Sequence, residues 1–315
     1  MITVLSGGTG GAKFVWGLAQ IVPAGQLTVI VNTGDDHKWW GLHVSPDLDS
    51  ILYTLAGKIS PERGWGLADE SFRCLERMRE LGAEGWFQAG DLDLATHLRR
   101  TQLLAEGKPL SEVTRSLCRA MGVAVNVLPM TDHKVETRIW TNGGGELSFQ
   151  EYFVRERSQP EVKKVNFEGA EKADTAPGVL EAIASAEKVF IAPSNPVTSI
   201  GPILAVPGVR EVLMNTTASV AAISPIVGGV AVSGPAGKLM ANRGWKASPA
   251  GIACAYRDWV DVVIADTEDE PERSAIEAYS VRSMFANTIM KTEADRTVLA
   301  RFALDALDFH REAVV

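Results

Sequence analysis

The amino-terminal segment alternates apolar runs with a glycine-rich turn in an order that few folds accommodate. An apolar run, ITVLS at residues 2–6, is followed by GGTGGA at 7–12, a helical pattern at 13–21 and a second apolar run, LTVIV, at 27–31. Short apolar runs of this kind are typical of strands buried on both faces. A strand, a helix and a second strand in that order indicate a parallel sheet with right-handed crossovers. We therefore predict an α/β fold with a mostly parallel sheet.

The turn after the first strand is a candidate phosphate-binding loop. It comprises Gly7, Gly8, Thr9, Gly10 and Gly11. Glycines let the backbone turn tightly and let a phosphate approach amide groups at the helix N-terminus. A dinucleotide fingerprint fits poorly, because its third glycine falls on Lys13, and Asn32 rather than an acid ends the second strand. The alternative is a tight strand-to-helix turn that binds nothing.

Residues 32–50, NTGDDHKWWGLHVSPDLDS, form the most acidic candidate site, with four carboxylates within fifteen residues. These carboxylates belong to Asp35, Asp36, Asp47 and Asp49. Residues 32–44 show no regular period and predict a loop, after which Ser45 and Pro46 favour a helix start. Acids clustered at a strand end can hold Mg²⁺, which takes oxygen ligands. The alternative is that Asp47 and Asp49 only complement the helix dipole.

Residues 47–121 differ from the rest because helical patterns follow one another there without a convincing strand. The predicted helices cover residues 48–56, 70–81, 94–106 and 111–121, the last with Ser111 as N-cap. We interpret 47–121 as a helical insertion or lid. Residues 1–46 and 122–315 would then form one discontinuous α/β domain.

The segment GDLDLATHLRR, residues 90–100, carries the candidate side chains of this insertion. Asp91 and Asp93 are possible ligands, and Arg99 and Arg100 are possible phosphate contacts, although a capped amphipathic helix is the simpler interpretation. His97 has no second histidine at ligand spacing, so its own residue pattern favours a structural role.

Further elements are predicted along the second half of the chain. Strands are expected at residues 123–128, 135–141, 146–154, 188–192, 220–224 and 260–265, with a hairpin turn at 142–145, and helices at 176–186 and from 290 onward. The strand at 188–192 is followed by PSNPVTSIGPIL, where a helix start carries Ser194, Asn195, Thr198 and Ser199. Lys238, in VSGPAGKLM, is either a point charge for phosphate or a surface lysine, because the Walker spacing is absent.

The strand ends bring four polar loops to one edge of the predicted sheet. Parallel strands end on a common side, where ligands of open α/β sheets bind. The loops cover residues 7–12, 32–46, 193–201 and 224–238. Phosphoryl transfer relies on positioning and charge neutralisation rather than on covalent work by side chains, so these residue types fit that class best.

Composition limits the partners of the chain. Its 315 residues carry a net charge of −8 and give a pI of about 5.3, which argues against broad binding of nucleic acid or anionic membranes. No apolar run is long enough to span a membrane, and the amino terminus lacks a secretion signal. Cys74, Cys118 and Cys254 fit no metal spacing, and we expect buried, reduced thiols in a cytoplasmic protein, with Cys74 in the core.

Seven segments together resemble the 2-phospho-L-lactate transferase (CofD-type) family of coenzyme F420 biosynthesis. They are SGGTGGAKF, NTGDD, SPDLDS, GDLDLATH, LPMTD, PSNPVTSIGPIL and SPIVGG…VSGPAGKLM, in order over nearly the whole chain. The resemblance implies a Rossmann-like α/β fold, Mg²⁺ dependence and a homodimer. It also implies the reaction: a guanosine-diphosphate-linked acid donates its phospho-acid unit to a ribityl hydroxyl of the deazaflavin Fo, and GMP leaves.

The resemblance also implies roles for individual residues. Asp36, Asp47 and Asp49 would hold Mg²⁺ and orient the ribityl hydroxyl, and one of them would take its proton. Donor binding would fall to the loop of Gly7, Gly8, Thr9, Gly10 and Gly11, to Ser194, Asn195, Thr198 and Ser199, and to Lys238. Contacts with Fo would come from Asp49, Trp40, Asp91 and His97, and the tricyclic ring could also meet Trp39, Trp65 or Trp86.

The sequence departs from the family pattern at Leu92, where the family commonly has arginine in GDRD. A deazaflavin or phosphate contact is in question there, and Arg99 or Arg100 could replace it. Two other functions stay open: a related regulatory protein that binds a nucleotide sugar without catalysis, and a nicotinamide-dependent oxidoreductase. The sequence does not select phosphoenolpyruvyl, 2-phospholactyl or 3-phosphoglyceryl as the transferred unit.

Overall fold

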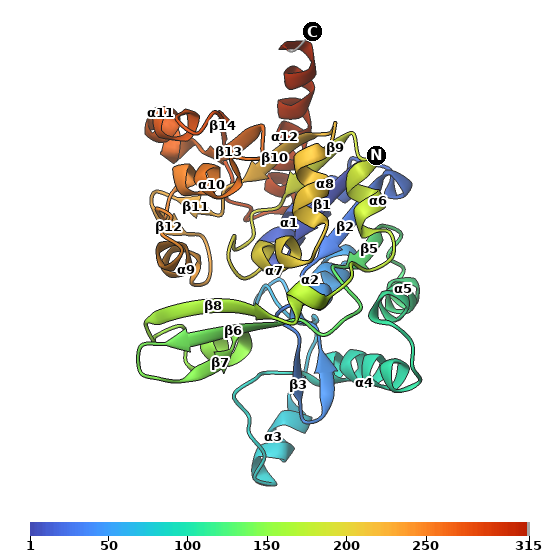
Figure 1. Cartoon of the computed structure of the whole chain (residues 1–315). Helices are drawn as coiled ribbons and strands as arrows, with labels where there is room; N and C mark the ends of the chain where they lie inside the picture. The colour runs from blue at the N-terminus through green and yellow to red at the C-terminus, as the bar shows by residue number, and fades with distance from the viewer. Residues whose placement is uncertain (314–315) are drawn as a thin grey trace.

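A seven-stranded parallel sheet forms the centre of the computed structural model, which describes residues 1–313, with side chains to residue 308 (Figure 1). The strand order is β14-β13-β10-β9-β1-β2-β5. The bounds are β1 (Ile2–Ser6), β2 (Leu27–Val31), β5 (Asn126–Pro129), β9 (Lys188–Ile191), β10 (Ser219–Ile223), β13 (Val262–Asp266) and β14 (Arg282–Ala286). Neighbouring strands all pair in parallel, which confirms the predicted Rossmann-like α/β fold.

Alternate side chains of the central strands enter two separate cores. In β1, Val4 packs on one face of the sheet and Leu5 on the other, and both are fully buried. In β9, Phe190 joins the core that contains Val4, while Ile191 joins the core that contains Leu5. Strands covered on both faces need apolar residues at every position, which explains the unbroken apolar runs in the sequence.

Helices cover both faces of this sheet. The core around Val4 is closed by α1 (Gly8–Ala19), α2 (Pro46–Leu55), α5 (Leu110–Met121) and α12 (Glu293–Ala313). The opposite core is closed by α6 (Val179–Ala184), α7 (Ile200–Ala205), α8 (Val209–Asn215), α9 (Ala236–Asn242), α10 (Pro249–Tyr256) and α11 (Arg273–Glu277). Three 3₁₀ turns, η1 (Ala24–Gln26), η3 (Ala170–Lys172) and η4 (Thr267–Glu272), complete the helical elements of this part.

A second group of elements lies below the main sheet in Figure 1. It contains an antiparallel sheet in the order β7-β6-β8, the hairpin β3–β4, a π-helical turn η2, and helices α3 and α4; the hairpin β11–β12 lies instead beside the main sheet, in contact with β13. The bounds are β3 (His37–Trp39), β4 (Leu42–Val44), β6 (Glu136–Thr141), β7 (Glu146–Ser148), β8 (Val162–Glu168), β11 (Ile226–Val227), β12 (Val230–Ala231), η2 (Glu151–Arg155), α3 (Arg73–Glu80) and α4 (Asp91–Ala105).

Several local predictions differ from the structure. The first helix begins at Gly8 rather than near residue 13, so the glycine loop is part of its first turn. Residues 32–44 contain the β3–β4 hairpin, because Trp40 and Gly41 adopt positive φ angles of 50° and 82° and reverse the chain. The strand expected at 146–154 ends at Ser148 and continues into η2. Pro109, not Ser111, is the N-cap of α5, and β8, β14 and α8 were not predicted, whereas α7 begins after Ser199, where a helix start was expected.

The predicted discontinuous domain, residues 1–46 with 122–315, and the insertion at 47–121 stay a prediction. Within 47–121 the structure has helices and no regular strand, and α2 and α5 share a core with α1 and α12. Cys74 is exposed, which contradicts its predicted place in the core, whereas Cys118 is buried and Cys254 partly buried. Within residues 1–313, no helix combines the length and apolar character needed to cross a membrane.

Candidate active site

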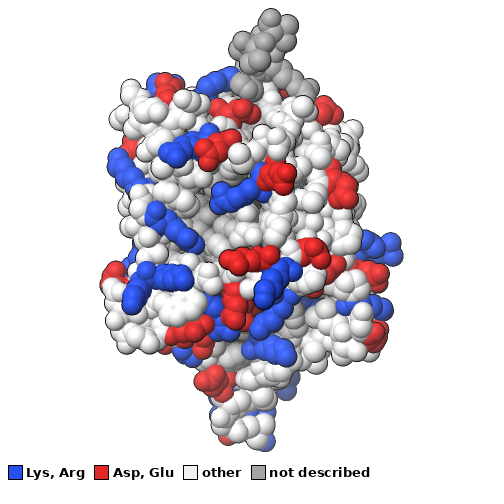
Figure 2. All heavy atoms as spheres, viewed as in Figure 1, with Lys and Arg blue, Asp and Glu red and all other residues white. Residues whose placement is uncertain are grey.

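A cavity of about 880 Å³ opens at the carboxyl edge of the central sheet. Residues that follow β1, β2, β9, β10 and β14 line it, together with side chains from α2, α4 and the segment around η2. The loops predicted to converge therefore meet, as expected for a parallel sheet. Lys and Arg are interspersed with Asp and Glu on the face of the molecule that Figure 2 shows.

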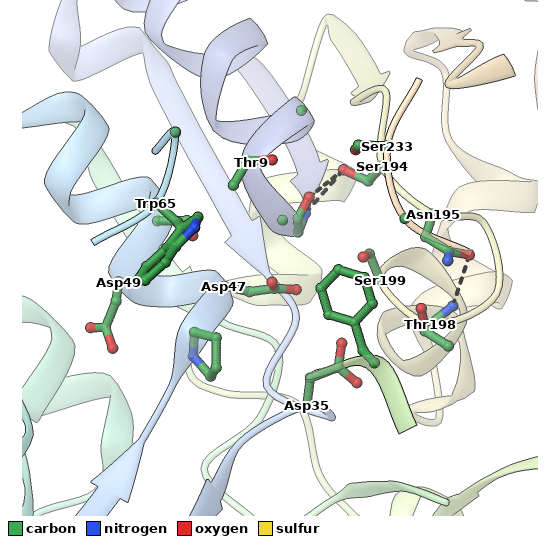
Figure 3. Close-up of a pocket in the computed structure, with 18 of the residues that line it drawn as sticks. Thr9, Asp35, Asp47, Asp49, Trp65, Ser194, Asn195, Thr198, Ser199 and Ser233 are labelled. Carbon is green, nitrogen blue, oxygen red and sulfur yellow. Dashed lines mark hydrogen bonds between the residues drawn. The ribbon is translucent and has the colours of Figure 1, made fainter. Parts of the chain in front are cut away.

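The glycine loop forms one wall of the cavity. Gly7 is the extended N-cap of α1, and Gly8 has a φ of +66°, a conformation that favours glycine. The Gly7 amide donates to Ser194 Oγ at 3.2 Å, and Ser194 Oγ donates to the Gly7 carbonyl oxygen at 2.6 Å (Figure 3). A side chain at Gly10 would press against the carbonyl oxygen of Pro193. The two loops are thus locked together, with the start of α1 facing the cavity, an arrangement suited to anions.

The loop after β9 forms the adjacent wall. Asn195 Oδ1 accepts the amides of Val197 at 3.0 Å and Thr198 at 3.3 Å, so the side chain fixes the turn before α7 (Figure 3). Thr198 is fully buried and its Oγ1 has no hydrogen-bond partner. Ser199 lies close to Gly7, because a Cβ placed on that glycine would be 2.8 Å from the Ser199 Cβ. Ser194, Asn195, Thr198 and Ser199 all line the cavity.

Asp35 and Asp47 form a buried carboxylate pair beside these loops. Asn32 Nδ2 lies 3.1 Å from Asp35 Oδ2, 2.9 Å from Asp47 Oδ2 and 3.1 Å from the carbonyl oxygen of Thr198. The two acids are only 4% and 7% exposed. In Figure 3, the Asp47 carboxylate points toward Ser199 and Asp35 rather than toward Asp49. One amide group therefore bridges two acids that would repel each other when both are charged.

Burial makes the charged form of both acids unfavourable. It raises the pKa of Asp35 well above its ordinary value, and the neighbouring Asp47 raises that pKa further. Burial also raises the pKa of Asp47 to about 6, although hydrogen bonds from Asn32 and the Gly8 amide oppose the shift. Asp35 Oδ1 is buried and accepts no hydrogen bond. The pair thus has free oxygen ligands and a charge that a bound cation would neutralise.

A second acidic group lies at the contact between α2 and α4. Arg100 Nη1 donates to Asp49 Oδ2 at 3.2 Å, and Arg100 Nη2 contacts Asp49 Oδ1. His97 lies between Asp49 and Asp93: its Nδ1 is 3.6 Å from Asp49 Oδ2, and its Nε2 is 3.4 Å from Asp93 Oδ2. Tyr53 donates to Asp93 Oδ1 at 2.6 Å.

The charges of this second group are partly compensated within the protein. Burial raises the pKa of Asp49, and the Arg100 charge opposes that shift. Burial alone would raise the pKa of Asp93, but His97 and Tyr53 hold it below its ordinary value. Asp49, Asp93 and His97 each offer one potential metal-ligand atom, and these atoms lie within 4.8 Å of one another, a spacing that could hold a metal ion. With Arg100 already on Asp49, however, a cation is less favoured here than at the Asp35–Asp47 pair.

Comparisons with known proteins assign the chain to a family. Residues 2–304 match the model of the family described as 2-phospho-L-lactate transferase CofD. The chain belongs to this family. A phosphoenolpyruvate transferase of Streptomyces griseus is 46% identical over 310 residues, which cover 96% of this chain and 97% of the relative. A 2-phospho-L-lactate transferase of Methanococcoides burtonii is 43% identical over 289 residues, covering 92% and 94%.

A solved structure supports the fold of this CofD-family chain. The crystal structure of a Bacillus halodurans protein aligns with a TM-score of 0.67, covering 96% of this chain and 98% of that one. The two sequences are only 16% identical, so this likeness concerns the fold alone.

Most residues selected from the sequence face the cavity in this family member. Those that line it are Gly7, Gly8, Thr9, Gly10, Asp47, Asp49, His97, Ser194, Asn195, Thr198 and Ser199. Five others do not line it: Gly11, Asp36, Trp40, Asp91 and Lys238. Of the tryptophans considered for the tricyclic ring, Trp65 and Trp86 line the cavity, whereas Trp39 and Trp40 pack against each other outside it.

The five residues outside the lining have other partners. A Cβ on Gly11 would meet Ser6 and Ser194, and Trp40 Nε1 donates to the carbonyl oxygen of Glu84. Asp36 Oδ2 accepts from Ser45 Oγ at 2.7 Å and lies 2.9 Å from His43 Nε2. Asp91 accepts from Ser71 and the Cys74 amide, and Lys238 Nζ donates to the carbonyl oxygens of Ser158 and Gln159.

Some lining residues were not selected from the sequence. Asp35 was noted in the acidic stretch, yet its neighbour Asp36 was preferred as a ligand. Phe149 and Phe153, whose rings stack with centroids 5.5 Å apart, were assigned to a strand, whereas Phe149 precedes η2 and Phe153 belongs to it. Lys13 and Lys291 also line the cavity, and the position of Lys13 in the first helix, after the glycines, was the available signal.

Proposed function

We propose that this chain is the transferase of coenzyme F420 biosynthesis that forms a phosphodiester on the deazaflavin Fo. A phospho-organic-acid unit would move from its guanosine-diphosphate-linked donor to a ribityl hydroxyl of Fo, with release of GMP. The observation that carries the proposal is one cavity that joins the two interlocked polar loops after β1 and β9 to the Asp35–Asp47 pair. The names of the relatives, which are transferases of phosphorylated three-carbon acids, support the same class of reaction.

The donor diphosphate is placed on the two loops. Gly8, Thr9 and Gly10, at the start of α1, line the cavity, and Ser194 and Ser199 line it beside them. Lys13 follows in the first helix and lines the same cavity, so it can add positive charge. Helix N-termini and short polar side chains bind phosphate oxygens without covalent chemistry.

The Asp35–Asp47 pair fits Mg²⁺. Both acids are almost fully buried, one carboxylate oxygen of Asp35 has no hydrogen-bond partner, and hard cations prefer oxygen ligands. A bound Mg²⁺ would supply Lewis-acid polarisation and neutralise charge on the transferring phosphate. Asn32 would hold both carboxylates in position through its amide group. The proposed ligands are therefore Asp35 and Asp47, in place of the Asp36 and Asp49 implied by the resemblance.

The acceptor is placed on the other side of the cavity. Asp49, Tyr53 and His97 offer hydrogen-bonding groups for the hydroxyls of a ribityl chain. Trp65, Trp86 and the stacked pair Phe149 and Phe153 line the cavity and offer flat apolar surface for a tricyclic ring. The attacking hydroxyl oxygen forms a bond to the distal phosphorus while the bond to the GMP oxygen breaks, and Asp47 or Asp49 takes the hydroxyl proton.

The test is turnover with defined substrates. The protein is incubated with Fo, Mg²⁺ and each guanosine-diphosphate-linked donor in turn: phosphoenolpyruvyl, 2-phospholactyl and 3-phosphoglyceryl. Mass spectrometry then measures the phosphodiester product and GMP, and competition among the donors identifies the preferred acid. Absence of both products with all three donors, together with tight binding of a nucleotide sugar, would favour the non-catalytic regulator.

We propose a homodimer as the working assembly, to be measured by light scattering.

A further inference from the structure

Arg100 is the most buried charged side chain next to the cavity. It is 1% exposed and among the largest fully buried side chains of the protein. A buried arginine is costly unless carboxylates and hydrogen-bond acceptors satisfy it. Its two terminal nitrogens meet both oxygens of Asp49, so the contact is bidentate. A bidentate fork fixes both the place and the plane of the carboxylate.

The fork is itself held in place by its surroundings. Arg100 Nη1 also lies 3.4 Å from the carbonyl oxygen of His43 and 3.3 Å from His97 Nδ1. These contacts join α4, which carries Arg100 and His97, to β4 and to α2, which carries Asp49. Asp49 lines the cavity and Arg100 does not. Any effect of Arg100 on a bound molecule must therefore pass through Asp49 or His97.

We propose that Arg100 is a positioning residue, which holds the Asp49 carboxylate at the cavity wall so that it can accept hydrogen bonds from the acceptor's hydroxyl groups. The inference rests on the proposed function and adds a specific device to it. The family resemblance led us to expect that Arg100 could contact a phosphate directly, in place of the arginine missing at Leu92. Leu92 is 50% exposed, and Arg100 is committed to Asp49 instead.

The adjacent arginine provides a matched control. Arg99 is exposed on the same helix, and its Nη1 donates to Gln102 Oε1 at 2.8 Å. The two arginines are adjacent in the sequence and have the same side chain, but they differ in burial and in contact with Asp49. Lysine keeps the charge but cannot form the bidentate fork, so Arg→Lys isolates geometry from charge.

The experiment compares R100K, R100Q, R99K and R99Q in the full chain, using steady-state kinetics with Fo, the preferred donor and Mg²⁺. We expect R100K to raise the KM for Fo and to lower kcat, so that kcat/KM for Fo falls about tenfold to a hundredfold. The KM for the donor should stay unchanged, and both Arg99 variants should match the wild type. A merely structural role would instead reduce the amount of active protein and leave both KM values unchanged.

A double-mutant cycle tests the route through Asp49. If Arg100 acts through Asp49, the D49N/R100Q protein is no less active than D49N alone, whereas independent roles would give additive losses. Additive losses, or an R100K enzyme with wild-type KM and kcat for Fo, overturn the assignment. If R100Q does not fold, which a thermal melt reveals, R100K decides, because it keeps a buried cation beside Asp49.

Failure of the positioning role and failure of the proposed function are distinguishable. Wild-type protein that turns over none of the three donors overturns the proposed function and the role of Arg100 with it. Wild-type protein with normal turnover, together with an R100K variant that is kinetically unchanged, overturns only the role of Arg100.

Discussion

Two buried acidic groups share one cavity, and their charges are balanced in opposite ways. The Asp35–Asp47 pair is bridged by a neutral amide from Asn32 and has no cationic partner among the described hydrogen bonds and ion pairs. Asp49 is instead bound by a buried arginine. When both acids of the first group are ionised, no protein cation among the described residues compensates their charge, and we propose that Mg²⁺ does so; in the second group Arg100 compensates the charge of Asp49. The comparison indicates that acids of one short stretch divide into a pair without a protein cation among its described partners, proposed to bind Mg²⁺, and an acid that a buried arginine holds at the cavity wall.

The largest effect that tests this contrast is expected from D49N. The substitution removes the negative charge of Asp49 and leaves Arg100 buried without a charged partner. Breaking a buried ion pair costs about 3–5 kcal/mol. We therefore expect a loss of that size in the free energy of unfolding, measured by urea denaturation, together with a large but measurable fall in kcat/KM for transfer. From the sequence alone one would expect D49N to abolish transfer with little loss of fold. A D49N protein as stable as the wild type would show that the ion pair contributes no net stability.

D47N should give the opposite pattern, with loss of activity and a retained fold. The substitution removes a ligand and a like charge from a buried pair, so stability is unchanged or increased, while transfer falls about a hundredfold or more. Turnover and thermal melts measure the two effects separately. D36N is the matched control, because Asp36 faces Ser45 and His43 rather than the cavity. Equal losses in D36N and D47N would remove the distinction between the two acids.

Magnesium should stabilise the protein through the first group only. A ligand that binds the native state at ten times its Kd raises the unfolding free energy by about 1.4 kcal/mol. We expect this gain in wild-type protein and in D36N, and its absence in D47N. Thermal melts against Mg²⁺ concentration, with Na⁺ at matched ionic strength as the control, measure it. An equal gain in D47N would place the cation elsewhere, for example at Asp49, Asp93 and His97.

The pH dependence of stability has a sign that follows from burial. The pKa of Asp47 is raised from 3.8 to about 6 in the folded protein, so the native state binds its proton more tightly than the unfolded chain. Stability from this group is therefore full below about pH 4 and is lost as pH rises to about 6. Without Mg²⁺, wild-type protein should lose stability relative to D47N over that range. A difference between the two that does not change with pH would contradict the raised pKa.

The sequence predicts the architecture better than the contacts within the site. Buried apolar runs such as 27–31 and the glycine turn after β1 depend on neighbouring residues, so the parallel sheet and the convergence of its loops follow from local pattern. The choice between Asp35 and Asp36 depends on how the β3–β4 hairpin leaves the sheet, which Trp40 and Gly41 set through their backbone angles. The pairing of Arg100 with Asp49 spans 51 positions, and no local period encodes it.

The smallest effect is expected from D91N, at the start of the helix that carries Arg100. Asp91 Oδ2 accepts from Ser71 Oγ at 2.6 Å, and Oδ1 accepts the Cys74 amide at 3.0 Å. These contacts hold the first turn of α3, and asparagine keeps one acceptor for them. The KM for Fo should therefore stay within about twofold of the wild type, as for substitutions away from a site. Hydrogen exchange should be faster in α3 alone.

A D91N protein with a much higher KM for Fo would change the comparison between the two acidic groups. It would place Asp91 at the acceptor, as the family resemblance implies, and would require the start of α4 to face the cavity in the complex. Asp93, two residues along the same helix, already lines the cavity and contacts His97. D93N measured in parallel therefore separates the two faces of α4: we expect D93N to raise the KM for Fo and D91N to leave it unchanged.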